Sequence, residues 1–446
     1  MIKSRLRKIL SYAITTAALM FVVSVASFAA TDFSFMNGYR ANGMGGAFTA
    51  VADDENAFFY NPAGITQRTD FLLQVVSFDS KIQDFGFFTN QFGNMSNFDG
   101  LSPSEQESIL SSLPRINLSL PNTAFITRPI PIGNNYLSFG MGFFSGIDLN
   151  LAFERQSSSD IFLNMDVNGT LVYAIPIAYE ITNLDAIRMP GKLSVGTNLK
   201  YISRYKVHQF INTSEFSNST ITQDLSAGDG FGADLGLLYS FTKELSFGLQ
   251  LKDFFGTTIN YASGYQSVST SSTGASVTQR IALYKETLDP SLSIGVSYVP
   301  EKIFNIDTKN RFTFAFDLQD IGGAGYPGGN FMDNVHAGVE YRLSPFALRL
   351  GLNSGRIAAG IGLETNGFQL AYSYYGEPSP YSTETAWVNQ FTLAFKIGHQ
   401  KGRPFGKAVD AANRAAASAP AQTNQPAPQE NQTETQQTAE PAAATK

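Results

Sequence analysis

The sequence predicts an all-β fold, a transmembrane antiparallel β-barrel of about fourteen strands with an N-terminal plug inside its lumen. Apolar and polar residues alternate with period two from about residue 71 to residue 397, as in strands that have one apolar face. Phe (37), Tyr (19) and Gly (39) are abundant while charged residues make up only 15%, which favours strands and turns. In addition, a compact glycine-rich run follows an export signal and needs a surface to pack against.

Residues 1–29 read as a signal peptide. Four basic residues precede an apolar stretch at 9–25, and Ala29 ends a site of small residues at cleavage spacing. The alternative is a membrane anchor, because this stretch nears the length of a spanning helix. No other apolar run approaches that length, so a mature membrane protein would have to cross with strands.

The segment 30–70 is predicted to form the plug. Its core is the run GMGGAFTAVADDENAFFYNPAG, from Gly43 to Gly64. Gly43, Gly45 and Gly46 permit a backbone path that is closed to other residues, and an Asn-Pro-Ala-Gly turn ends the run. A phosphate-binding loop is the rival interpretation, but no Lys-Ser/Thr and no strand-turn-helix pattern accompany these glycines.

The strands of the barrel are predicted across residues 71–398. In one example Phe312, Phe314 and Phe316 share one face, while Thr313 and Asp317 share the other. The apolar faces run for about nine to eleven residues, the length that a tilted strand needs to cross a bilayer. The expected spans are 71–78, 122–128, 135–144, 169–181, 192–205, 231–241, 245–254, 291–299, 311–319, 334–343, 346–353, 356–364, 368–375 and 387–397.

The connections between these spans alternate between short turns and long polar loops. Short periplasmic turns and long external loops are typical of outer-membrane barrels, so we expect both termini in the periplasm. The link at 353–355 breaks the rule, because it is short where a long one is due. The expected long loops are 79–121, 145–168, 206–230, 255–290 and 320–333.

Two further segments have distinct composition. In the first long loop, Ser102 and Glu105 have the spacing of a capping box and predict a short helix. Residues 399–446 are rich in Ala, Pro, Gln and Thr and predict a disordered periplasmic tail.

The composition also argues against several functions. The chain has no Cys and three His, so we expect no catalytic residues, no metal and no cofactor. His336 and Glu340 are interpreted as a polar pair in the lumen rather than as catalytic groups. A net charge of −6 argues against nucleic acid as a partner. The chain is therefore not expected to be an enzyme.

The Gly43–Gly64 run resembles the N-terminal signature of the FadL family of outer-membrane transporters, and more closely that of its PorV-like relatives. The resemblance implies a hatch that plugs the barrel. Asn61, Pro62 and Ala63 would then belong to the hatch, with Asp53 and Asp54 as its acidic turn. The glycine path would be Gly43, Gly45 and Gly46.

In function, the resemblance implies passive diffusion of small hydrophobic compounds, of the fatty-acid or aromatic class, through the plugged barrel. The family's lateral exit into membrane lipid, near the third strand, would fall at Gly140, Gly142 and Gly146. The loops that should bind such a ligand are nevertheless rich in Ser, Thr and Asn.

Two alternatives remain open. One is a PorV-like accessory barrel with exported proteins as partners, and the other is a general porin. A plug inside a barrel must also satisfy its buried carboxylates, for which the candidate lumen cations are Lys200, Lys252, Arg342, Arg349 and Lys396.

Overall fold

The computed structural model describes residues 38–83, 115–155, 161–212, 220–270, 275–280, 283–304, 306–308, 311–321, 331–378 and 385–398, with Phe85, Ser102 and Glu105. No helix in these ranges is long and apolar enough to span a membrane. The predicted signal peptide 1–29 and tail 399–446 lie outside the described residues, as does most of the helix expected after Ser102. The capping pair itself is present, because Glu105 Oε2 accepts hydrogen bonds from the Ser102 hydroxyl at 2.6 Å and from its backbone N–H at 2.8 Å.

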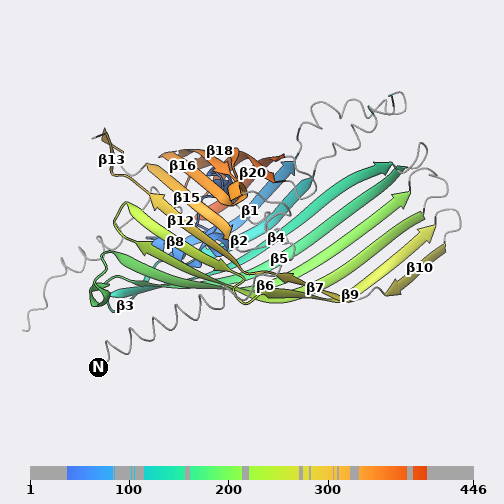
Figure 1. Cartoon of the computed structure of the whole chain (residues 1–446), viewed down its shortest axis with the longest axis horizontal. Helices are drawn as coiled ribbons and strands as arrows, with labels where there is room; N and C mark the ends of the chain where they lie inside the picture. The colour runs from blue at the N-terminus through green and yellow to red at the C-terminus, as the bar shows by residue number, and fades with distance from the viewer. Residues whose placement is uncertain are drawn as a thin grey trace, which may run out of the picture. The chain divides into compact units, whose positions relative to one another are not determined.

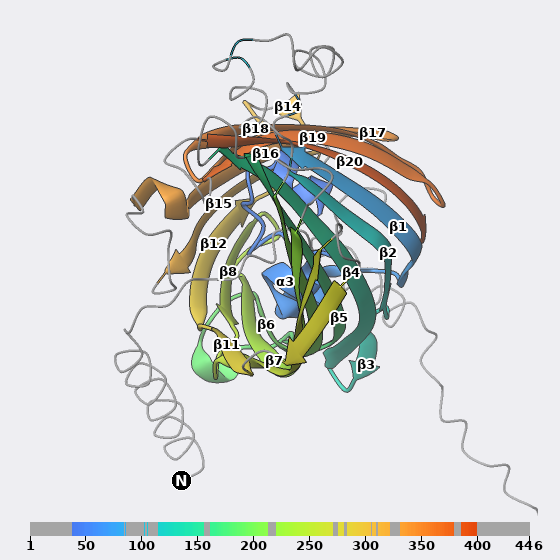
Figure 2. The ribbon, with the colours of Figure 1, turned by 90° about the vertical axis from the view of Figure 1, so that its right-hand side faces the viewer.

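Fourteen strands of the described chain form a closed antiparallel ring, which confirms the predicted fold class (Figures 1 and 2). In ring order they are β1 (Leu72–Gln83), β2 (Ile116–Ile126), β4 (Asn135–Arg155), β5 (Ile161–Ile181), β6 (Lys192–Asn212), β7 (Thr220–Ser240), β8 (Leu245–Lys252), β12 (Ser291–Tyr298), β15 (Phe312–Ile321), β16 (Val335–Leu343), β17 (Phe346–Asn353), β18 (Arg356–Glu364), β19 (Gln369–Pro378) and β20 (Thr385–Ile397). The last strand pairs back with the first, from Leu73 opposite Ile397 to Gln83 opposite Val388. This pairing closes the ring.

The alternation of side chains decides which face of the wall is the lumen. On β20, Val388, Gln390 and Thr392 are buried, whereas Trp387 and Phe391 face outward and are 36% and 46% exposed. A closed ring leaves no open edge within the apolar band, and its outer face is apolar enough to meet lipid. The polar face is therefore the interior.

Four strands are much taller than the rest. β4, β5, β6 and β7 have 21 residues each, and Figure 1 shows them extending past the ends of β16, β18 and β20. The predicted long loops at 145–168 and 206–230 were thus wrong in part, because most of each is strand. The alternation persists there, with Ile147 and Leu149 outward and Asp148 inward, but the inward side chains are polar and suggested loops.

The loop predicted at 255–290 was also wrong, since it holds three further strands: β9 (Thr257–Thr270), β10 (Ala275–Arg280) and β11 (Tyr284–Leu288). The upper part of β7 leaves β8 and pairs with β9 instead, and β9 in turn pairs with β10. We call the upper halves of β4 to β7, with β9 and β10, the raised sheet.

The remaining described elements are short. They are the strands β3 (Ile130–Ile132), β13 (Lys302–Ile303) and β14 (Ile306–Asp307), and the helices α2 (Tyr39–Gly43), α3 (Ala57–Tyr60), η2 (Pro62–Gln67), η5 (Asp185–Ile187) and η6 (Phe331–Asn334). The short link at 353–355 is a tight turn between β17 and β18, with Ser354 and Gly355 both in the left-handed region.

Outward-facing aromatic side chains mark where the tall strands leave the membrane. Phe143, Tyr173, Tyr201 and Phe231 lie directly opposite one another on β4 to β7, with neighbouring ring centroids 4.9, 6.3 and 4.9 Å apart. Below this row each strand has about nine or ten residues, enough to cross the bilayer. Aromatic rows of this kind sit at membrane interfaces, so the raised sheet projects beyond one of them.

The lumen is filled by residues 38–68, which contain α2, α3 and η2 and are called the plug below. Figure 2 shows α3 inside the ring of strands. Plug side chains such as Met44, Phe48 and Phe58 are fully buried and share a core with wall residues such as Val172 and Ile202. The core of this protein is therefore the contact between plug and wall.

Candidate functional site

The glycine path of the plug is set by close approach to the wall. Gly45 and Gly46 have φ of 66° and 82°, in the left-handed region. A Cβ on Gly45 would lie 2.4 Å from the carbonyl oxygen of Leu352 on β17. Gly43 is almost as close, because its Cβ would lie 3.2 Å from the Cα of Gly360 on β18. Backbone therefore packs against backbone on both sides of this contact.

The Asn-Pro-Ala element docks on a different part of the wall. The Asn61 amide donates to the carbonyls of Thr49 at 2.9 Å and Leu237 at 3.0 Å, while its Oδ1 accepts from the Ala63 N–H at 3.1 Å. Pro62 starts η2, where its missing N–H costs nothing. The facing wall position is Gly236 on β7, whose Cβ would lie 2.2 Å from Asn61 Oδ1.

Asp53 and Asp54 of the plug bind a cation of the plug itself. The Arg40 guanidinium donates to Asp53 and, at 2.8 Å, to Asp54. Its other nitrogens bind Glu340 of β16 at 2.9 and 3.0 Å. Burial alone would lower the pKa of Arg40, but Asp53 and Glu340 outweigh it and raise that pKa well above its usual value. Arg40 stays charged and joins the plug to the wall.

The expectation that lumen cations bind the plug carboxylates is met by Lys396, which binds Glu55, whereas Arg349, Arg342 and Lys200 bind carboxylates of the wall. Arg349 donates to Glu340 at 2.7 Å and also to Glu364. Arg342 donates to Glu340 at 2.9 Å. Lys200 binds Asp234 at 2.7 Å and Asp253 at 2.9 Å, at the point where β7 changes partner.

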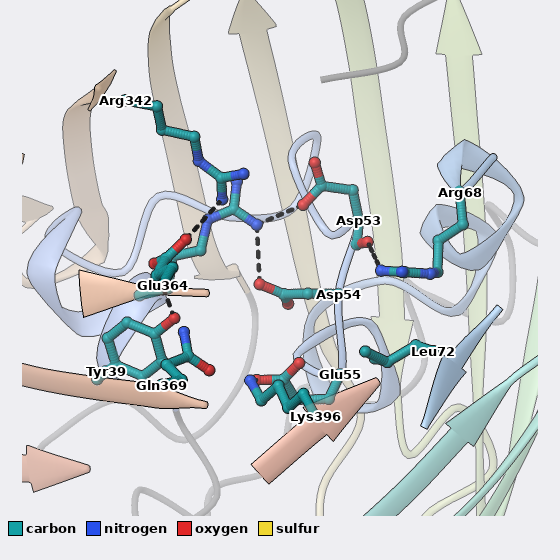
Figure 3. A pocket seen from close by; sticks show the side chains of 11 residues that line it. Tyr39, Asp53, Asp54, Glu55, Arg68, Leu72, Arg342, Glu364, Gln369 and Lys396 are labelled. Carbon is teal, nitrogen blue, oxygen red and sulfur yellow. Dashed lines mark hydrogen bonds and ion pairs between the residues drawn. The ribbon is translucent and has the colours of Figure 1, made fainter. Parts of the chain in front are cut away.

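Lys396 of β20 is a wall cation that contacts the plug. Its Nζ lies 2.5 Å from Glu55 Oε1. Figure 3 shows Glu55 and Lys396 among the charged side chains around a small polar pocket. The pocket is lined by Tyr39, Arg40, Asp53, Asp54, Glu55, Arg68, Leu72, Arg342, Glu364, Gln369 and Lys396.

Arg68 is a tether that the sequence did not reveal. It donates to the carbonyl of Asp53 in the plug at 3.1 Å and to that of Gly398, after the last strand, at 2.6 Å. A third bond reaches the Asp70 carbonyl at 3.2 Å, just before the first strand. Burial lowers the pKa of Arg68, although Asp53 opposes this. In the sequence, only its position shortly after the Asn-Pro-Ala-Gly turn distinguishes Arg68.

Asp317 on β15 also contacts the plug. The sequence pattern predicted only that it lies on the polar face of its strand. Its Oδ2 accepts hydrogen bonds from the backbone N–H groups of Phe48 and Thr49, both at 2.8 Å. His336, its neighbour across the pair of strands, bonds through Nδ1 to the Gly45 carbonyl at 2.8 Å. The polar faces of β15 to β18 and β20 thus hold one side of the plug by charge and hydrogen bonds.

The opposite side of the plug packs aromatic side chains on apolar wall residues, and two wall amides, of Asn198 and Gln250, donate to the Phe58 and Phe59 carbonyls at 2.7 Å. Phe58 and Phe59 pack edge-on against Phe144 of β4, with ring centroids 5.3 and 4.7 Å away. Gly140 and Gly142 lie beneath Phe58, since a Cβ on either would come within 3.1 Å of its ring. The two glycines thus accommodate a plug aromatic.

A break in the wall lies beside Gly146. β2 and β4 pair at Leu118 opposite Ile147 and resume at Thr123 opposite Phe143. Side chains bridge the interval, for Ser119 Oγ donates to the Ser145 carbonyl at 2.7 Å. The pairing of β4 with β5 shows no register shift. The irregular strand is therefore β2, the neighbour of the strand that was singled out.

A charged cluster lies above the apolar wall. Arg204 and Lys206 both bind Glu286 of β11, at 2.7 and 2.9 Å, and the Tyr261 hydroxyl donates to the same carboxylate at 2.7 Å. Tyr261 stacks on Tyr284 with centroids 4.3 Å apart. Two cations therefore share one carboxylate here.

Comparison with known proteins identifies the family. A family model described as "F plasmid transfer operon, TraF, protein" matches residues 58–319, more than half of the chain. The chain belongs to this TraF family. The matched range begins in α3 of the plug and ends in β15, so it covers the tall strands of this TraF-family barrel. No curated protein matches.

Solved structures with similar coordinates include two toluene transporters and a FadL homologue. The toluene transporter TbuX of Ralstonia pickettii is 15% identical, with 81% of this chain and 98% of that one covered and a TM-score of 0.48. The P. putida toluene transporter TodX is 12% identical, covering 82% and 99%, also at 0.48. A Pseudomonas aeruginosa FadL homologue is 10% identical, covering 82% and 98%, at 0.45. None of these comparisons supports the finer resemblance to PorV-like relatives.

Proposed function

We propose that this TraF-family barrel lies in the outer membrane and admits small hydrophobic compounds by passive diffusion past its plug. The observation that carries the proposal is the apolar half of the lumen, where Phe58 and Phe59 of the plug face Phe144, Val172 and Ile202 of the wall. A general porin has a polar, water-filled interior and no use for this surface. An apolar ligand can replace the ring contacts of Phe58 and Phe59 while their carbonyls keep the hydrogen bonds from Asn198 and Gln250, both at 2.7 Å.

The plug is proposed to yield on this side alone. Removing one partner of a buried ion pair costs roughly 3–5 kcal/mol, so separating Arg40 from Glu340 is unfavourable. Apolar contacts exchange for ligand contacts at far lower cost. The glycine path Gly43, Gly45 and Gly46 and the Asn61 element would then stay docked while the side chains of Phe58 and Phe59 move aside.

The proposed route runs from the cluster above the apolar wall to the break between β2 and β4. Arg204 and Lys206 would hold an anionic headgroup, which favours fatty-acid-like compounds over plain aromatics. The exit would lie at the break between Phe143 and Ile147, which starts at the level of the aromatic row and where side-chain hydrogen bonds rather than a backbone ladder join the strands. We place both termini in the periplasm because Gly398 and the short turns occupy one end.

Ligand binding to the detergent-solubilised protein tests this proposal. Ile202→Asn puts a polar group in the apolar lumen and should weaken binding of a fluorescent fatty acid by about tenfold. Ser203→Asn, the adjacent outward position, is the control and should change binding by less than about twofold. The proposal would be overturned if the unmodified protein showed no saturable binding, or if Ile202→Asn did not weaken that binding.

Two further variants separate the ligand classes. Arg204→Gln with Lys206→Gln should weaken binding of the fatty acid but leave binding of an uncharged alkylbenzene unchanged. Equal loss for both ligands would show that the cluster shapes the lumen and does not hold a carboxylate.

A second function is favoured by the raised sheet, whose inner face carries polar side chains such as Asp148, Asn168 and Lys206. This surface suits an accessory barrel that receives an exported protein. Co-purification of one stoichiometric protein partner, lost when the tips of β4 and β5 are shortened, would favour it over transport.

A further inference from the structure

The connection between β12 and β15 carries the most exposed aromatic side chain of the described chain. β13 and β14 form a small hairpin, with Lys302 opposite Asp307 and Ile303 opposite Ile306. Phe304 at its tip is 94% exposed and Ile306 is 71% exposed. Phe304 also has φ of 48°, a backbone conformation that is unfavourable for a residue with a side chain. Exposing an apolar tip of this kind to water is unfavourable.

The hairpin is firmly fixed at its base. The Glu301 N–H donates to Glu244 Oε1 at 2.7 Å, and the Val299 N–H donates to the Glu244 carbonyl at 2.8 Å. Across the hairpin, the Thr308 N–H donates to the Glu301 carbonyl at 2.9 Å. The apolar tip is therefore held away from the wall by a hydrogen-bonded stem.

The base of the hairpin lies at the second aromatic belt of the barrel, at the short-turn end. Tyr298, the last residue of β12, faces outward and is opposite Phe314 of β15. Phe247 of β8 faces outward nearby, at the position opposite Val296 of β12. Outward aromatic residues at this level mark the other membrane interface. The hairpin thus leaves the wall where the bilayer surface lies.

The direction of the hairpin agrees with this placement. Figure 1 shows β13 beyond the ends of β12 and β15, and Figure 2 shows β14 outside the ring of strands. A tip that projects outward at the level of the belt meets lipid before it meets the periplasm.

We propose that the hairpin is an interfacial anchor, whose tip residues Phe304 and Ile306 insert into the inner leaflet of the outer membrane. Apolar tips of this size enter the boundary between headgroups and acyl chains, at a depth of about 5–10 Å. The exposed charges of Glu301, Lys302 and Asp307 stay at headgroup level. The anchor fixes the height and rotation of the barrel in the bilayer, independently of what the lumen transports.

Fluorescence of a single tryptophan tests the anchor, because the chain has only one, Trp387. Trp387→Phe removes it, and Phe304→Trp then places the only indole at the tip. In phosphatidylcholine and phosphatidylglycerol vesicles we expect blue-shifted emission, and quenching by about half when the lipids are brominated near the top of their chains. Phe331→Trp in the same background is the control, since Phe331 is 67% exposed on η6, away from the short-turn end.

Three outcomes decide the matter. Blue-shifted, bromine-quenched emission at 304 but not at 331 supports the anchor. Water-like emission at both positions overturns it. Protection in native membranes without quenching in pure lipid vesicles also overturns it, because a protein then covers the tip. Ile306→Trp supplies a second probe should the Phe304 substitution disturb the turn.

Discussion

Arg40 and Glu340 are 300 positions apart in the sequence, and their side chains are joined by two parallel hydrogen bonds of 2.9 and 3.0 Å. The pair is fully enclosed, with both side chains no more than 2% exposed. A bidentate guanidinium–carboxylate contact fixes orientation as well as distance. It therefore defines how the plug sits in the barrel.

Arg40→Met should destabilise the docked plug by roughly 3–5 kcal/mol, because Asp53 and Glu340 each lose a buried partner. The measurement is the urea midpoint of unfolding in detergent. Unfolding is monitored by the loss of the faster, heat-modifiable gel mobility of the folded barrel. Arg356→Met is the matched control, since its contact with Asp333 is about one-fifth exposed. That variant should lose less than about 1 kcal/mol.

Gly45→Ala should prevent close docking of the plug, because the new Cβ would overlap the Leu352 backbone. Gly133→Ala is the control, as Gly133 also has positive φ, 62°, but has no neighbour within 4 Å of an added Cβ. Backbone strain alone should cost the control roughly 1–2 kcal/mol. The Gly45 variant should lose about 1–3 kcal/mol more, the usual cost of overpacking. Equal losses in urea unfolding would refute the role of close approach.

Arg68→Met should loosen the seam where the first and last strands meet. The variant removes four charge-assisted hydrogen bonds to carbonyl oxygens. We expect faster amide hydrogen exchange at Leu72, Leu73 and Lys396, with the exchange of β5 and β6 unchanged. Arg128→Met, at an exposed turn, should leave all of these rates alone.

Deletion of residues 38–64 should leave a barrel that still folds and conducts more ions in planar bilayers. The reason is that the plug fills the lumen, with Met44, Phe48 and Phe58 fully buried there. Conductance equal to that of the intact protein would show that the plug does not obstruct the pore. Ile202→Asn should not raise conductance, because it leaves the plug docked.

The barrel was predictable because its wall repeats one rule. Each strand from Leu72 to Ile397 puts alternate residues into lipid or lumen, and that period is visible in any short window. The upper halves of the tall strands were not predicted. Above the row of Phe143 and Tyr201 the inner face stays polar, so an extended strand and a polar loop look alike in composition.

The partners of the charged residues could not be predicted. Asp53 and Asp54 were expected to meet wall cations, yet Arg40 is closer in sequence and satisfies both. Arg68 has no motif that distinguishes it from an ordinary surface cation. Pairing inside the lumen depends on the register of many strands at once, and a local sequence window does not contain that information.

The sequence by itself determined a β-barrel wall and a plug that packs backbone against backbone, because alternation and glycine act through local geometry. Only the tertiary structure decided that the plug is held by charge on one side and by Phe58 and Phe59 on the other. It also located the break between β2 and β4 and the projecting tip at Phe304. These features arise when residues distant in the chain are brought together by ring closure, so their energies exist only in the closed barrel.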